Sequence, residues 1–170
     1  RVQHGCPWCP WCGTQAGPIL IFDSKSRVLQ LEARQHTGGV LCLALAPPSS
    51  RGFVCSGGAD RRLNMWSLDG KFIKTYSGHT GAVRSVLVLG LEIWTASDDH
   101  SVRVWDAAYG LFQLETKACR VTLSGHTGAV HALLAHRDGV LSCAADGTVR
   151  VWRVGGAHEC VREVSLACGP

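Results

Sequence analysis

The sequence predicts an all-β protein built from repeated small antiparallel sheets. Three observations lead to this fold class. One set of four residue types recurs three times in the same register along the 170 residues. Within each recurrence, apolar residues alternate with a period of two over short runs, which is typical of strands. Turn-forming Asp and Gly residues separate these runs, and no sustained 3.6-residue apolar period indicates a helix.

The recurring set is centred on a tryptophan. An Asp lies six residues before each of these tryptophans, and a Ser or Thr lies four residues before each Asp. A His stands upstream in every unit, twice within the same stretch Gly-His-Thr-Gly-Ala-Val. Such regular recurrence indicates structural repeats of about 40–45 residues. The three sets are His36, Ser56, Asp60 and Trp66; His79, Thr95, Asp99 and Trp105; and His126, Ser142, Asp146 and Trp152.

Each unit contains four short runs that predict strands. Around Trp105, one run covers residues 83–89, and residues 91–96 and 102–105 form the next two. Residues 71–76 form the fourth kind of run, which is separated by one residue from the pair Gly78–His79. Repeats of four short antiparallel strands are what the blades of a propeller require.

The pattern resembles the WD40 family. Gly78–His79 and Gly125–His126 match the Gly-His pair of that family, and Trp105–Asp106 matches the Trp-Asp dipeptide that names it. The other two units depart from the dipeptide, with Trp66–Ser67 and Trp152–Arg153. The resemblance implies WD40 β-propeller blades of four antiparallel strands in an incomplete ring, with three full blades and one degenerate partial blade.

The expected division of the chain follows from these repeats. The partial blade has Phe22 at the Trp position, Ala16 at the Asp position and Cys12 at the hydroxyl position, so packing alone would hold it. Residues 159–166 are expected to form the outermost strand of the last blade. The expected segments are a divergent Cys/Pro/Trp segment (1–11), the partial blade (12–35), WD40 repeats at 36–78, 79–125 and 126–166, and a tail (167–170).

Ser, His and Asp together also suggest a hydrolase. A nucleophilic triad is built once, in a pocket beside an oxyanion site. Here the trio occurs three times, always at a fixed distance from a Trp. The resemblance implies a buried chain in which the indole N–H reaches the hydroxyl, the hydroxyl reaches His, and His reaches Asp. We therefore expect structural hydrogen-bond sets and no catalytic residue.

The resemblance also points to two positions per blade on the narrow face of the propeller. One position follows the Val of the innermost strand, and the other directly precedes the turn Asp. Arg84, Asp98 and His131 are the candidate partner-binding residues among them, because they could hold a charged or polar ligand. The alternative is that they are solvated rim residues without a particular ligand. The apolar residues at these positions are Leu41, Ala59 and Ala145.

Cys6, Cys9 and Cys12 form two overlapping C-x-x-C spacings, with His4 nearby. Such spacing suggests zinc ligands or a redox pair. A zinc site normally has a second pair close by, whereas the next cysteine is Cys42, and a thioredoxin-type pair needs a βαβ setting. We expect no metal and no cofactor, and we expect residues 9–12 to fall where the partial blade needs a strand.

Composition and charge are those of a globular protein, with 46% hydrophobic and 18% charged residues. The net charge of +4 comes from scattered basic residues, so nucleic-acid partners are not expected. The longest uncharged apolar stretch, residues 38–46, is far too short for a membrane span. We expect an intracellular, cytoplasmic protein, with the nucleus as the alternative.

The predicted function is a protein-interaction scaffold that has other proteins as partners and is not an enzyme. One alternative is the targeting module of a multidomain enzyme whose catalytic domain lies outside these residues. The other is a phospho-peptide or phosphoinositide reader that uses Arg84. In the family a closed ring usually has about seven blades. We therefore expect closure to need the remaining blades of a longer parent chain or another subunit.

Overall fold

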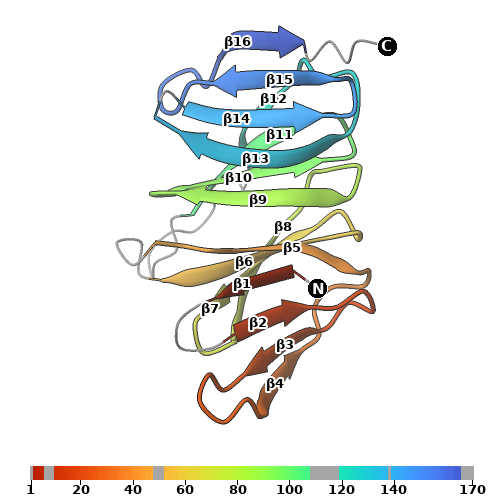
Figure 1. Ribbon diagram of the computed structural model, residues 1–170, viewed down its shortest axis with the longest axis vertical. Helices are drawn as coiled ribbons and strands as arrows, with labels where there is room; N and C mark the ends of the chain where they lie inside the picture. Colours follow the sequence, from red (N-terminus) through yellow and green to blue (C-terminus); the bar gives the residue numbers. More distant parts are fainter. Residues whose placement is uncertain (1, 6–9, 48–51, 108–118, 138, 166–170) are drawn as a thin grey trace.

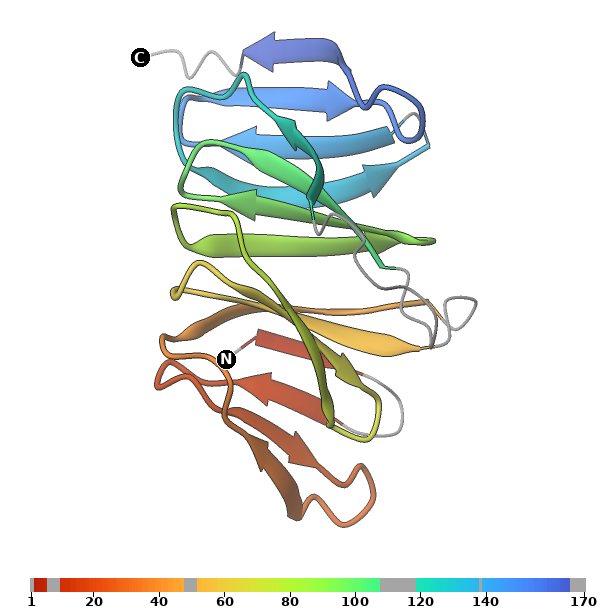
Figure 2. The same ribbon diagram turned by 180° about the vertical axis from the view of Figure 1, so that it is seen from behind.

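The protein is a stack of four antiparallel sheets, each formed by four consecutive strands. The computed structural model describes residues 2–5, 10–47, 52–107, 119–137 and 139–165. Within these residues every regular element is a strand. Figures 1 and 2 show the sheets stacked one above the next in chain order, with the first at the bottom and the fourth at the top. The predicted all-β fold, with four-stranded blades in a ring that does not close, is confirmed.

The strands follow one another from the inner to the outer edge of each sheet. The first sheet contains β1 (Val2–Gly5), β2 (Pro10–Gly13), β3 (Ile19–Phe22) and β4 (Leu29–Ala33). The second contains β5 (Val40–Leu45), β6 (Phe53–Gly58), β7 (Leu63–Ser67) and β8 (Phe72–Tyr76). The third contains β9 (Val83–Leu89), β10 (Glu92–Ser97), β11 (Val102–Asp106) and β12 (Cys119–Leu123). The fourth contains β13 (Val130–His136), β14 (Gly139–Ala144), β15 (Thr148–Trp152) and β16 (Cys160–Ser165).

The first sheet is larger than the sequence predicts. Residues 1–11 were expected as a divergent segment, with residues 9–12 at a strand position of the partial blade. In the structure β1 pairs with β2 from Val2↔Gly13 to Gly5↔Pro10. Backbone pairing needs no particular side chain, and the Cys- and Pro-rich run hides the alternation that marks other strands. The partial blade is therefore a four-stranded sheet, in which β2 covers part of the strand expected at residues 9–12.

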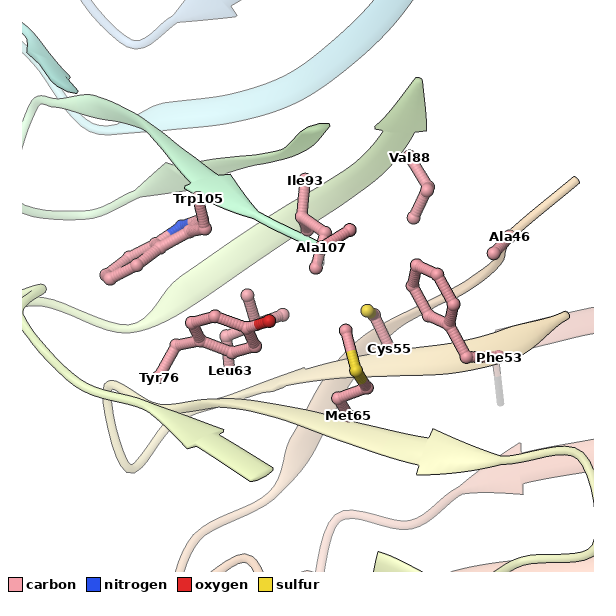
Figure 3. Packing of buried hydrophobic residues seen from close by; sticks show 10 residues of the cluster. All are labelled: Ala46, Phe53, Cys55, Leu63, Met65, Tyr76, Val88, Ile93, Trp105 and Ala107. Atoms are coloured by element: carbon pink, nitrogen blue, oxygen red, sulfur yellow. The ribbon is translucent and has the colours of Figure 1, made fainter. Parts of the chain in front are cut away.

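Apolar cores lie between successive sheets, and neighbouring innermost strands contact one another. Figure 3 shows the core between the second and third sheets, where Tyr76 and Met65 point toward Trp105 and Ile93. Among the described residues, no helix is long and apolar enough to cross a membrane. The core between the first two sheets contains Trp11, Ile19, Ile21, Ala33, Val40, Leu43, Val54 and Trp66. The core between the last two contains Trp94, Ala96, Val102, Val104, Leu123, Val130, Val140 and Trp152.

Candidate functional site

The structure brings the four residue types of each repeat together inside one sheet. In the fourth sheet, Trp152 Nε1 donates a hydrogen bond to Ser142 Oγ over 2.7 Å. Ser142 Oγ lies 2.7 Å from His126 Nε2, and His126 Nδ1 lies 3.0 Å from Asp146 Oδ2. Ser142 is on β14 and Trp152 on β15, while His126 precedes β13, so the set joins three parts of one sheet.

The other two sets repeat this geometry. In the third sheet the distances from Trp105 to Thr95, from Thr95 to His79 and from His79 to Asp99 are each 2.7 Å. In the second sheet the corresponding distances are 2.8, 2.8 and 2.9 Å. The residues of that set are His36, Ser56, Asp60 and Trp66.

The direction of each hydrogen bond follows from the chemistry of the groups. A carboxylate only accepts, so His79 Nδ1 carries the proton that is donated to Asp99. His79 Nε2 then accepts from the Thr95 hydroxyl, which in turn accepts from Trp105 Nε1. Burial lowers the pKa of His79 and outweighs the raising effect of Asp99. The lowered pKa keeps the imidazole neutral, as this series of hydrogen bonds requires.

The aspartate ties two loops of one sheet together. Asp99 Oδ1 accepts from the backbone N–H of Ser101, over 3.0 Å, within the β10–β11 turn. Its Oδ2 accepts from the backbone N–H of Thr80, over 3.0 Å, in the segment that enters β9. Burial raises the pKa of Asp99, but hydrogen bonds from Ser101 and His79 outweigh this effect and lower it to about 2. The ionised carboxylate therefore fixes where the innermost strand begins.

These sets are closed to substrates in this geometry. The exposed fraction is 0% for Ser56 and Thr95 and 1% for Ser142. Each hydroxyl already has an imidazole and an indole as partners. Apolar cores lie on both sides of the second and third sheets and on one side of the fourth. A nucleophile needs an approach path for the carbonyl or phosphoryl group that it attacks. The arrangement supplies register and satisfied buried polar groups.

The three candidate partner-binding residues lie together at the exposed edge of the sheets. Arg84 Nε and Nη2 donate to the two carboxylate oxygens of Asp98 over 2.8 and 2.7 Å. The Arg84 side chain is 43% exposed and that of Asp98 28% exposed. The hydrogen bond from Arg84 is the main cause that lowers the pKa of Asp98, and the charge of His131 acts in the same direction. The edge thus carries both signs of charge, while the neighbouring Ala59 and Ala145 are exposed and apolar.

The first sheet has no comparable polar set among its described side chains. Cys12 Sγ lies 3.8 Å from the adjacent Gly13 carbonyl oxygen, and Phe22 stands where the other sheets have Trp. Trp11 packs edge-on against Trp66, with ring centroids 6.5 Å apart. Packing therefore accounts for how this sheet is held.

A polar cluster between the third and fourth sheets has no counterpart in the sequence pattern. Glu92 accepts from Trp94 Nε1 over 3.1 Å and from Arg120 over 3.2 Å, and His158 Nε2 lies 2.9 Å from it. The His158 ring stacks at a tilt on Trp94, with centroids 5.5 Å apart. These residues share no repeat position, so no signal in the sequence singled them out.

No group of three His, Cys, Asp or Glu residues could hold a metal ion in the part of the chain that the structure describes. Cys6 and Cys9, on which the zinc and redox alternatives depend, lie outside the described residues. Cys12 is half-buried on β2 as a free thiol.

The four-stranded sheets and their repeated Trp–hydroxyl–His–Asp sets define a β-propeller repeat protein. A family model described as WD domain, G-beta repeat matches residues 27–67, 70–106 and 117–153. The chain therefore belongs to the WD40 repeat family. Each matched repeat begins at or just before the outermost strand of one sheet and ends at the third strand of the next, so every repeat links two sheets covalently.

Curated relatives match parts of the chain. The nuclear distribution protein nudF of Aspergillus niger is 34% identical over 80 residues, which are 45% of this chain and 18% of that protein. The nudF protein of Aspergillus terreus is 28% identical over 109 residues, 52% of this chain and 24% of that protein. The ribosome biogenesis protein YTM1 of Candida glabrata is 42% identical over 53 residues, 31% of this chain and 12% of that protein. The matches thus span a quarter or less of these relatives.

Proposed function

We propose that this chain is a non-catalytic scaffold that binds other proteins through the exposed edge formed by Arg84, Asp98 and His131. The observation that carries the proposal is that the polar residues of the repeats fall into a buried group and an exposed group. The Ser, His and Asp residues that resemble a triad are buried in the sheets as fixed hydrogen-bond sets. Arg84 and Asp98 on the exposed edge are by contrast accessible to a ligand, with side chains 43% and 28% exposed.

The charges of this edge favour a protein surface over a phosphate group. The Arg84 guanidinium uses two of its five N–H donors on Asp98, so a phosphate bound by the remaining donors would lie near a carboxylate that repels it. A protein surface offers both acidic and basic groups and can match both signs. The names of the relatives, a nuclear distribution protein and a ribosome biogenesis protein, support a role in the assembly of larger systems, in the cytoplasm or the nucleus.

Quantitative affinity capture tests this proposal. The wild-type chain is compared with the double variant Arg84→Ala/His131→Ala and with the control Arg153→Ala. Arg153 is also an exposed arginine in an ion pair, 2.8 Å from Glu159, but it follows β15 and lies at the other end of the strands. We expect a group of captured proteins to fall at least several-fold with the double variant and to remain with the control.

Two outcomes would contradict the proposal. An unchanged capture profile for the double variant, with an unchanged melting temperature, would remove the exposed edge as the binding site. Loss of the same proteins after phosphatase treatment of the lysate would favour a phospho-peptide reader instead.

A further inference from the structure

A pocket of about 330 Å³ lies where the third and fourth sheets meet, away from the exposed edge. Arg84 and His131, on the exposed edge, are the second residues of β9 and β13. The pocket is bordered by the last residues of the same two strands. We call it the hairpin pocket, after the β13–β14 hairpin. Its lining includes Leu89, His136, Arg137, Gly139, Arg153 and Val154.

The backbone holds the β13–β14 hairpin tightly against β15. Gly139 has φ +146°, and a Cβ at this residue would collide with the carbonyl oxygen of Trp152. His136 lies opposite Gly139 in the register of the sheet, so this close approach also fixes where β13 ends. The hairpin pocket is therefore formed before any ligand arrives, and binding does not have to order this hairpin.

The basic residues of this hairpin depart from the repeat. Counted from the repeat Trp, His136 and Arg137 stand where the third sheet has Leu89 and Gly90. The two hairpins have the same length, because in both sheets the last residue of the innermost strand pairs with the first residue of the next strand. The hairpin thus forms equally well without basic side chains, so folding does not account for them.

Arg137 is the cation of the pocket that is open to a ligand. Arg153 has Glu159 as its partner, at 2.8 Å. Arg137 is exposed and forms no ion pair with the residues that the structure describes. Asp138, the next residue in the sequence, lies outside the described residues. The planar guanidinium of Arg137 offers N–H donors in the fork that matches a carboxylate.

Apolar side chains border the same pocket. Val154 follows β15 and is 43% exposed, and Leu89 is half-buried at the end of β9. Burying such exposed apolar surface under a ligand is favourable. The volume of about 330 Å³ is near the lower limit of pockets that enclose a whole small molecule. The pocket therefore suits a single apolar side chain whose neighbours stay outside.

We propose that the hairpin pocket binds a short peptide segment of a partner protein in which an acidic residue lies close to a large apolar one. The apolar side chain packs on Leu89 and Val154, and the carboxylate pairs with Arg137. Inorganic phosphate would use Arg137 alone and leave the apolar lining uncovered, so the lining favours a peptide. This site is separate from the proposed function, because it lies at the other end of the strands from Arg84.

Selection from a phage-displayed library of short random peptides tests the proposal. The immobilised protein is the Arg84→Ala/His131→Ala variant of the full chain, so that peptides specific for the exposed edge are not selected. We expect the enriched peptides to carry Asp or Glu within a few residues of a large aliphatic or aromatic residue. The most enriched peptide, synthesised with a fluorescein label, is then the probe for binding measured by fluorescence polarisation.

Two substitutions in the pocket should weaken binding of this peptide at least several-fold. Arg137→Glu reverses the charge that meets the carboxylate, and Val154→Ser removes apolar surface from the lining. Both residues are exposed, so the melting temperature should not change. The matched control is Arg62→Glu, because Arg62 is an exposed arginine in the β6–β7 turn of the second sheet. Binding of the peptide to this control should equal binding to the unchanged chain.

An exchange of charges shows whether the peptide carboxylate meets Arg137 itself. A second peptide has Lys in place of the acidic residue of the first. This peptide should bind the wild-type chain weakly and should bind Arg137→Glu more tightly than the acidic peptide does. Binding of the acidic peptide to the wild-type chain should also weaken as the salt concentration rises, because the ion pair lies at the surface.

Five results would overturn the proposal. These are a selection that enriches no peptide, enriched peptides without acidic residues, equal binding by the wild-type chain and Arg137→Glu, no gain from the exchange of charges, and displacement of the peptide by inorganic phosphate at the same concentration. The outcome is independent of the proposed function, because the immobilised chain already lacks the Arg84 and His131 side chains on which that function depends.

Discussion

Ser142→Ala removes the central group of one buried hydrogen-bond set without changing the apolar packing around it. Ser142 is 1% exposed and joins Trp152 Nε1 and His126 Nε2, each at 2.7 Å. The substitution leaves a buried indole donor and a buried imidazole acceptor without a partner. Each orphaned group costs about 1–3 kcal/mol, so we expect a loss of about 2–4 kcal/mol after neighbours relax.

The assay is thermal unfolding followed by circular dichroism, with chemical denaturation as a second measure. For a chain of this size the loss corresponds to a melting temperature lower by about 5–15 °C. Ser142→Thr keeps the hydroxyl, as Thr95 does in the third sheet, and should retain most of the stability. Ser165→Ala, at an exposed serine, controls for the loss of a hydroxyl in general. If the melting temperature of Ser142→Ala equals that of Ser165→Ala, the buried set does not stabilise the sheet and our reasoning is wrong.

Three further predictions address other features. The pKa of Asp99 is lowered from 3.8 to about 2, so its contribution is complete above about pH 4 and lost toward pH 2. Asp99→Asn should remove about 2 kcal/mol of that pH dependence in melts, and equal slopes in both proteins would contradict this. Gly139→Ala would place a Cβ against the carbonyl oxygen of the adjacent strand, whereas Gly155, with φ +78°, has open space. We expect a loss of more than about 2 kcal/mol for Gly139→Ala and about 1 kcal/mol for Gly155→Ala, measured by denaturation. Burial raises the pKa of the Cys42 thiol to about 12, so iodoacetamide should modify exposed Cys160 in the native protein and Cys42 only after unfolding, as peptide mass spectrometry would show.

The repeat register made most of the fold predictable. Trp, hydroxyl, His and Asp recur at fixed spacings because each sheet repeats the same four strands and the same turn. The distances from Trp105 to Thr95 and from His79 to Asp99 therefore follow a pattern that the sequence already displays. The first sheet was predicted less well, because residues 1–11 carry no such register although β1 and β2 pair there.

The candidate binding edge was predicted only in part. Family positions placed Arg84, Asp98 and His131 on the same face, but the bidentate ion pair between the first two became visible only in the structure. That pair changes the chemistry of the edge from a free cation to a mixed-charge surface. The contact between Glu92 and His158 joins two sheets through residues that share no repeat position.

The sequence by itself determined what happens within each sheet: the number of strands in the three regular units, their turns, and the identity of the buried polar partners. Local spacing suffices there, because strand pairing and tight turns fix which residues meet. Only the tertiary structure decided which side chains meet between sheets and which stay exposed at the ends of the stack. Those contacts depend on how successive sheets are stacked, which brings together side chains such as Trp94 and His158 and leaves Leu134 uncovered.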